Sequence, residues 1–211
     1  MSNTMLLISS LLLPLLGALG IIITRKFPNL REAVTLLAAS AVAVVVVTIA
    51  IRFFAGESFS LLVSEPIPGI RIAFKIESLG MLFALVAGLL WIVTSIYAIG
   101  YMRSHHEKNQ TRFYAAFAVA IACTLGLAFS DNLFTLFLFY ELLTLSTYPL
   151  VTHAGNDEAR RGGRTYLGIL LGTSIGLFLL GILVTWVVAG TVTFSTGGVL
   201  DYGVTFKGLP A

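Results

Sequence analysis

One carboxylate stands apart from the other charged residues of this sequence. Glu141 lies inside a long apolar segment, ten residues after Asp131. At 1.5 Å per helical residue, this spacing puts Glu141 roughly 15 Å into the segment, near the centre of a bilayer if the segment spans one. An ionised carboxylate at that depth is costly unless it is protonated or paired. Proton exchange within a membrane is therefore the first chemistry that the sequence suggests.

Hydroxyl side chains follow Glu141 at helical spacing. Thr144, Tyr148 and Thr152 continue from it in steps of three, four and four residues, which predicts one stripe along a helix. Pro149 cannot donate a backbone hydrogen bond, so it opens or kinks the helix beside this stripe. We expect the stripe to hold a chain of water and to handle protons. The alternative is a protonated glutamic acid that only hydrogen-bonds a neighbouring helix.

Other candidate site residues carry weaker signals. His153 ends the same segment, where it could relay protons at neutral pH, although an interfacial histidine without such a role fits equally well. His105 and His106 are adjacent, which does not make a metal site, and Cys123 is the one cysteine. The sequence has no nucleotide-binding glycine motif and no haem or iron–sulfur pattern. We therefore expect no metal, no cofactor and no redox or hydrolytic centre.

Small residues at four-residue spacing form stripes on two apolar segments: Gly80, Ala84 and Gly88 on one, and Gly168, Gly172 and Gly176 on the other. Such a stripe lets a second helix approach closely. We expect both stripes to serve helix packing rather than substrate binding.

Apolar segments must position all of these residues. Apolar residues make up 57% of the chain and charged residues only 11%, whereas soluble domains carry about a quarter charged residues. The charge-free intervals predict an all-α integral membrane protein with about six transmembrane helices. The whole chain, residues 1–211, is expected to form a single membrane domain with spans at about 5–23, 33–51, 78–101, 113–130, 132–153 and 166–189.

One connection has a strand pattern of its own. Between the second and third spans, apolar and polar residues alternate from Ile70 to Ile76, after a short apolar stretch at 58–63 and the turn residues Pro68 and Gly69. This pattern predicts a short β-hairpin, which we expect on the outer face.

The bases predict the orientation of the spans. One face would collect nine of them: Arg25, Lys26, Arg31, Arg103, Lys108, Arg112, Arg160, Arg161 and Arg164. The other would collect four: Arg52, Arg71, Lys75 and Lys207. By the positive-inside rule the nine-base face is cytoplasmic, and both termini are non-cytoplasmic. Bases in short loops act as orientation signals, so we expect no nucleic-acid partner.

Several motifs resemble one family of membrane subunits. The sequence reads YAIGYM at 97–102, DNL at 131–133, FYELL at 139–143 and STYPL at 146–150. Together these resemble the N-terminal six-helix part of antiporter-like membrane subunits. That family occurs in respiratory complex I, in Mrp-type sodium/proton antiporters and in membrane-bound hydrogenases. The pair Tyr148-Pro149 is more similar to Mrp-type D or hydrogenase subunits than to the complex I L-type.

The resemblance implies a function and partners. It implies a membrane subunit of a multisubunit complex that moves protons or exchanges sodium for protons, related to NADH:quinone oxidoreductase membrane subunits. Such a chain would be a non-redox subunit in a prokaryotic cell membrane, surrounded by other membrane subunits. In the family, the glutamate that matches Glu141 pairs with a lysine on the seventh span, and switching of that pair is thought to drive proton movement.

The sequence departs from the family in one respect. It contains six spans, and no base lies within them. We therefore expect the lysine to come from another chain, with this chain as a half-subunit or a fragment. The alternatives are a structural or assembly subunit that transports nothing, and an intramembrane enzyme, for which no paired catalytic residues are present.

Overall fold

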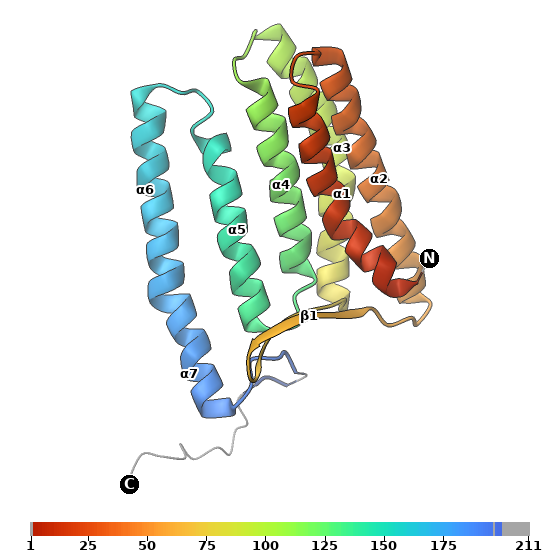
Figure 1. Ribbon diagram of the computed structural model, residues 1–211, viewed down its shortest axis with the longest axis vertical. Coiled ribbons are helices and arrows are strands. Elements are labelled where there is room, and N and C mark those ends of the chain that lie inside the picture. The colour runs from red at the N-terminus through yellow and green to blue at the C-terminus, as the bar shows by residue number, and fades with distance from the viewer. Residues whose placement is uncertain (1, 196, 200–211) are drawn as a thin grey trace.

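The computed structural model describes residues 2–195 and 197–199 as a bundle of long helices with a β-hairpin at one end (Figure 1). The elements, in chain order, are α1 (Asn3–Ile23), α2 (Pro28–Phe54), β1 (Ser60–Ile67), β2 (Ile70–Lys75), α3 (Ser78–Ser104), α4 (Gln110–Ala128), α5 (Leu133–Val151), α6 (Asp157–Thr173), the π-helix η1 (Ser174–Leu179) and α7 (Leu180–Ala189). The last three form one continuous helix, Asp157–Ala189. The described part thus holds six helices that are long and apolar enough to cross a membrane, which confirms the predicted fold class.

Each helix overlaps one predicted span, and local signals set its ends. Pro28 lies in the first turn of α2, where its missing N–H is tolerated, so α2 begins at 28 rather than 33. Asn132 and Asn156 cap α5 and α6, and the side-chain oxygen of each accepts the backbone N–H three residues later at 2.8 Å. The cap moves the start of α6 to Asp157, ahead of the apolar residues that predicted the span.

Helices α1 to α4 form the closely packed part of the bundle. α1 packs against α2 and α4, and α3 packs against the same two helices. Leu7, Ile21, Val42, Trp91 and Leu125 are almost completely buried between them. α5 packs along α4, and α6 lies beyond α5 at the side of the bundle (Figure 1).

The predicted stripe of small residues on α3 is a packing surface. A Cβ atom at Gly80 would overlap the backbone carbonyl oxygen of Ala128 on α4. Ala84 is fully buried, and a Cβ atom at Gly88 would contact Val46 on α2 at 3.6 Å. The structure confirms the packing role on α3 and shows that Gly80 allows a closer approach than any side chain could.

Large apolar side chains also cover the outside of the bundle. On α3, Leu79, Val93 and Tyr97 are 81%, 61% and 72% exposed, and on the last helix Leu177 and Val187 are 74% and 76% exposed. Water disfavours such continuous apolar faces, whereas hydrocarbon does not. The surface is therefore that of an integral membrane protein.

The hairpin is confirmed, but its alternation is only partly as predicted. β1 and β2 pair antiparallel, and Gly69 at the turn has a φ of +85°, a conformation that favours glycine. The neighbours Ala73 and Phe74 of β2 are both buried, which breaks the expected period of two. The pairing register shifts twice between Leu62 and Ile67, and these irregularities twist the hairpin.

The hairpin crosses the end of the bundle and ties α5 to it (Figure 1). Lys75 N donates to Phe129 O at 2.7 Å, and Asp131 N donates to Ala73 O at 3.0 Å, so β2 is bonded to the α4–α5 connection. The segment 191–195 is bonded to the other side of the same connection. One end of α5 is therefore fixed by main-chain hydrogen bonds on two sides.

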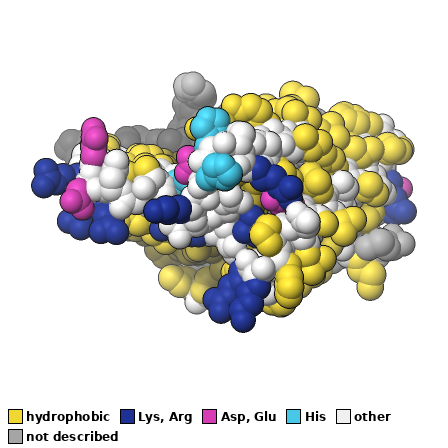
Figure 2. All heavy atoms as spheres, turned by 90° about the horizontal axis from the view of Figure 1, so that it is seen from above, with side chains coloured by type: hydrophobic (Ala, Val, Ile, Leu, Met, Phe, Trp, Pro, Cys, Tyr) yellow, Lys and Arg dark blue, Asp and Glu magenta, His cyan; other side chains and the backbone are white. Residues whose placement is uncertain are grey.

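The two ends of the bundle differ in charge. The "hairpin end" carries Arg52, Arg71 and Lys75. The "basic end" comprises the connections α1–α2, α3–α4 and α5–α6 with the adjoining helix ends, and Figure 2 shows Lys and Arg side chains gathered over it. All nine bases of the predicted cytoplasmic face lie at the basic end, whereas Lys207 lies outside the described residues. The assignment of this end to the cytoplasm stays a prediction.

Candidate functional site

Glu141 lies near the middle of α5, eight residues or about 12 Å from its first residue. Both carboxyl oxygens are buried, and neither has a hydrogen-bond partner within the described part of the chain. Native proteins rarely leave a buried carboxyl without donors, because this forfeits its solvation. Any hydrogen-bond partner of these two oxygens therefore lies outside the described residues.

The half of α5 that precedes Glu141 is held tightly. Thr135 Oγ1 accepts a hydrogen bond from the backbone N–H of Ala73 at 3.1 Å and donates one to the backbone carbonyl of Arg71 at 3.2 Å. The ring of Phe139 packs edge-on against Phe74, with centroids 5.3 Å apart. A Cβ atom at Gly126 on α4 would overlap the Phe139 ring, so α4 and α5 approach closely here. These contacts fix the depth and rotation of Glu141.

The hydroxyl residues of the predicted stripe lead from Glu141 toward the basic end. Thr144 and Thr152 are buried, Tyr148 is partly buried, and Thr152 Oγ1 donates to the carbonyl of Tyr148 at 2.9 Å. α5 stays helical past Pro149 and ends two residues later. That Pro149 opens or kinks the helix beside the stripe stays a prediction. That the stripe carries protons stays a prediction.

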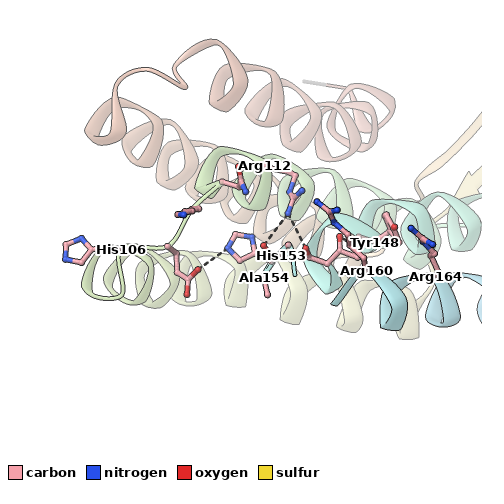
Figure 3. Close-up of a pocket in the computed structure, with 12 residues that line it drawn as sticks. His106, Arg112, Tyr148, His153, Ala154, Arg160 and Arg164 are labelled. Carbon is pink, nitrogen blue, oxygen red and sulfur yellow. Dashed lines mark hydrogen bonds and ion pairs between the residues drawn. The ribbon is translucent and has the colours of Figure 1, made fainter. Parts of the chain in front are cut away.

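A cavity of about 750 Å³ opens at the basic end, between α4, α5 and α6 (Figure 3). It brings together Tyr148 and His153 of the predicted site, whereas Glu141 does not line it. Bases from three elements line it as well: Lys108, Arg112, Arg160 and Arg164. We call this the "basic cavity".

His153 is a partly buried residue of the basic cavity. Neither ring nitrogen has a hydrogen-bond partner among the described residues, and Nε2 lies 3.8 Å from the Glu107 carboxylate. Beside it, Arg112 Nη2 donates to the carbonyls of Thr152 and His153 at 3.3 and 3.4 Å (Figure 3). Arg112 thus ties α4 to the end of α5 and closes one side of the cavity.

Gly163, which was not predicted from the sequence, is the glycine that allows α5 and α6 to meet. A Cβ atom there would overlap the Thr152 side chain and lie 3.1 Å from the Tyr148 ring. By contrast, Gly168, Gly172 and Gly176 are exposed, and nothing described lies within 4 Å of a Cβ atom at any of them. Their predicted packing role stays a prediction, for a helix outside the described residues. The role of Gly163 depends on the approach of α6 to α5, which the spacing of residues does not reveal.

A second buried carboxylate was also not predicted. Glu32 on α2 is 5% exposed, and Arg103 on α3 donates to both of its oxygens, with Nε–Oε1 at 3.0 Å. Arg31, also 5% exposed, lies 3.8 Å from Glu32, and its guanidinium sits 5.4 Å above the Tyr114 ring. It donates to Gln110 at 2.6 Å. We call these residues the "Glu32 cluster".

The sequence contains a signal for the Glu32 cluster. Charge alone places Arg31 and Glu32 in a connection, outside the second span. Pro28 predicts an earlier helix start, which puts both residues inside the first two turns of α2 and within reach of α3 and α4.

Two family models match the sequence of this bundle. The model for the N-terminus of chain 5 of NADH-ubiquinone oxidoreductase (complex I) matches residues 68–114. The model for the transmembrane region of NADH:quinone oxidoreductase and Mrp antiporter subunits matches residues 130–201, which include Glu141. Together the two models match more than half of the residues of the chain. The chain belongs to the antiporter-like membrane subunit family.

Relatives of this antiporter-like subunit include members from bacteria and plastids. It is 27% identical over 133 residues to the putative antiporter subunit mnhA2 of Staphylococcus haemolyticus, which covers 62% of the chain and 16% of that relative. It is 34% identical over 82 residues to the chloroplastic NAD(P)H-quinone oxidoreductase subunit 5 of Adiantum capillus-veneris, which covers 39% of the chain and 11% of that relative. The chain thus spans less than a fifth of the length of either.

Solved structures share the fold of the antiporter-like subunit. One chain of the archaeal membrane-bound sulfane sulfur reductase matches with a TM-score of 0.76 and 18% identity, covering 91% of this chain and 39% of that one. A chain of the Mrp complex from Dietzia sp. matches with a TM-score of 0.70 and 18% identity, covering 89% and 20%. The predicted family is confirmed. The subdivision inferred from Tyr148-Pro149 is not supported, because the matches are to chain 5 and A-subunit types.

Proposed function

We propose that the antiporter-like subunit belongs to a multisubunit membrane complex that translocates protons, or exchanges sodium for protons, with Glu141 as its intramembrane protonation site. One observation carries the proposal. Glu141 has two buried carboxyl oxygens without a partner in the described residues, at mid-helix in a membrane span. Intramembrane carboxyls of this kind typically mark ion and proton pathways.

The neighbours of Glu141 supply a route to the basic end. His153 and Tyr148 line the basic cavity, and Thr144 lies between Tyr148 and Glu141 on α5. Tyr148 is seven residues from Glu141, about 10 Å along the helix, a distance that hydroxyl groups and water can bridge. In this proposal a proton enters at the basic cavity, passes the hydroxyl stripe and binds Glu141. By the positive-inside rule the entry is cytoplasmic.

A basic partner would complete the site. A lysine close to Glu141 would favour the ionised carboxylate, and withdrawal of the lysine would favour proton uptake. No Lys or Arg of the described residues forms an ion pair with Glu141. We infer that the lysine comes from a segment outside the described residues or from another membrane subunit. The names of the relatives, an antiporter subunit and a quinone oxidoreductase subunit, support an assembly of this kind.

The test is Glu141→Gln in membrane vesicles that contain the assembled complex. The change preserves shape and removes the titratable group, so we expect proton movement, followed with a pH-sensitive dye, to fall to background. Glu158→Gln is the matched control, because Glu158 is an exposed carboxylate on α6. Equal assembly of both variants should be verified by native electrophoresis. Unchanged proton movement in Glu141→Gln would overturn the proposal.

A structural subunit without transport activity is the second candidate. The observation in its favour is the exposed stripe Gly168, Gly172 and Gly176, which presents a smooth surface to another helix. This candidate predicts that Gly172→Leu prevents assembly while Glu141→Gln has no effect on translocation. Normal assembly of Gly172→Leu would count against it.

A further inference from the structure

The basic cavity holds more positive charge than its own chain neutralises. Lys108, Arg112, Arg160 and Arg164 line it, and none of them has a carboxylate within 4 Å in residues 2–195 and 197–199. Glu107 is the one acid of the lining, and it faces His153 instead. Like charges gathered around one cavity raise the local positive potential, so the cavity should attract an anion.

The arginines are placed to hold an anion from two sides. Arg160 and Arg164 are four residues apart on α6 and therefore share one side of that helix. Arg112 faces them from α4, and two backbone carbonyls accept hydrogen bonds from its Nη2 (Figure 3). A guanidinium has five N–H groups, so Arg112 is held in place and still has donors for a ligand.

His153 adds a donor in the wall of the same cavity. Its ring nitrogens are buried and make no hydrogen bond with any described residue. Buried polar atoms in native proteins nearly always have partners. A ligand oxygen in the basic cavity would provide one, and with it a reason for enclosing the ring.

We propose that the basic cavity binds a phosphate group, and that its occupant is the headgroup of an anionic phospholipid. Guanidinium groups match phosphate oxygens in pairs, and these arginines have no paired carboxylate to compete for them. The cavity lies at the end of three spans, the depth of the headgroup layer, and basic pockets between membrane helices bind such headgroups. Leu145 and Val151 of α5 are 50% and 45% exposed and offer apolar surface for acyl chains.

This site is separate from proton binding at Glu141. The four positive charges of the cavity repel cations, so a bound anion that offsets them would also favour proton entry by the proposed route. Lipid binding can be measured without any transport, so a negative lipid result leaves the proton-site proposal for Glu141 intact, and a negative transport result leaves the lipid proposal intact.

The test compares Arg164→Gln with Arg161→Gln in the assembled complex. Both arginines are exposed on α6, but only Arg164 lines the basic cavity. The complex is incubated with phosphatidylglycerol in detergent micelles, and bound lipid is counted by native mass spectrometry. We expect Arg164→Gln to lower the apparent affinity about fivefold and Arg160→Gln/Arg164→Gln to lower it further, as loss of one basic contact to an anionic lipid implies. Arg161→Gln should bind like the unaltered protein.

A second arm identifies the source of the phosphate. Inorganic phosphate and zwitterionic phosphatidylcholine replace phosphatidylglycerol in the same measurement. Binding of phosphatidylglycerol alone supports the lipid headgroup. If inorganic phosphate binds and Arg164→Gln weakens that binding, the phosphate site stands but its assignment to a lipid headgroup is overturned. Equal phosphatidylglycerol binding by Arg164→Gln and Arg161→Gln would overturn the proposal altogether.

Discussion

Glu32 and Glu141 are both buried carboxylates on membrane helices, yet their surroundings are opposite. Glu32 accepts hydrogen bonds from Arg103 and lies 3.8 Å from Arg31. Glu141 has no described partner for either oxygen. Glu32 lies at the end of its helix, where charge can reach the membrane boundary, and Glu141 lies at the middle. The first carboxylate joins helices, whereas we propose that the second exchanges a proton.

The contrast extends to the two sides of the bundle. The Glu32 cluster joins α2, α3 and α4, which pack closely around a continuous apolar core. α5 meets the last helix near Gly163, through the hydroxyls of Thr147 and Tyr166, and through the ring of Phe178. Only 11% of the most apolar stretch of α5 is buried, whereas 50% of the most apolar stretch of α4 is buried. We infer that α1 to α4 form the scaffold. We also infer that α5 carries the proposed proton site at Glu141 and that α5 and α6 pack against helices outside the described residues.

Glu32→Gln should cause the largest loss of stability in the scaffold. It leaves the buried Arg31 without its carboxylate, and breaking a buried ion pair costs about 3 kcal/mol. Thermal unfolding of the purified protein in detergent would measure the loss. Glu57→Gln is the matched control, because its pair with Arg52 is 4.0 Å long and partly exposed, which makes its contribution about 1 kcal/mol or less. Equal losses in the two variants would remove the distinction between a joining carboxylate and an exposed one.

Gly80→Ala should destabilise the scaffold by about 2 kcal/mol, as overpacking of a close contact does. The added methyl group would overlap a backbone carbonyl oxygen of α4, which can move only with its helix. Gly100→Ala on the same helix has nothing within 4 Å and should be neutral or slightly stabilising. The same unfolding measurement applies. A neutral Gly80→Ala would show that α3 and α4 are not as closely packed as the structure indicates.

Asp131→Asn should have the smallest effect, visible as a change in pH dependence. Burial raises the pKa of Asp131 above its ordinary value of 3.8, an increase that Lys75 opposes. A raised pKa means that the folded state binds the proton more tightly, so stability falls as pH rises from about 3.8 through the raised value. Asp131→Asn should remove that fall, measured as melting temperature against pH. Parallel curves for both proteins would refute the assignment.

Much of the fold could be predicted from the sequence because hydrocarbon imposes a simple rule. Charge-free segments must be helices, so the six spans and the depth of Glu141 followed directly. The hairpin followed from its turn residues. Its burial pattern did not, because Ala73 and Phe74 are both covered by contacts with α5, through Thr135 and Phe139.

The candidate site was predicted less completely. The stripe from Glu141 to Thr152 follows from helical periodicity, which is local. The basic cavity, the Glu32 cluster and the role of Gly163 depend on which helices are neighbours, and periodicity does not contain that information. The π-helix at Ser174–Leu179 was not predicted either, since no proline or charge marks it.

Proton translocation per assembled complex, measured side by side for Glu141→Gln and Glu32→Gln, tests the central claim most directly. Vesicles are loaded with a pH-sensitive dye, and the initial rate is divided by the amount of assembled complex. We predict that Glu141→Gln assembles fully and translocates at background rate, because it lacks the exchangeable group. Glu32→Gln should assemble less but retain a near-normal rate per complex. The opposite pattern, with full translocation in Glu141→Gln and none in assembled Glu32→Gln, would contradict the account.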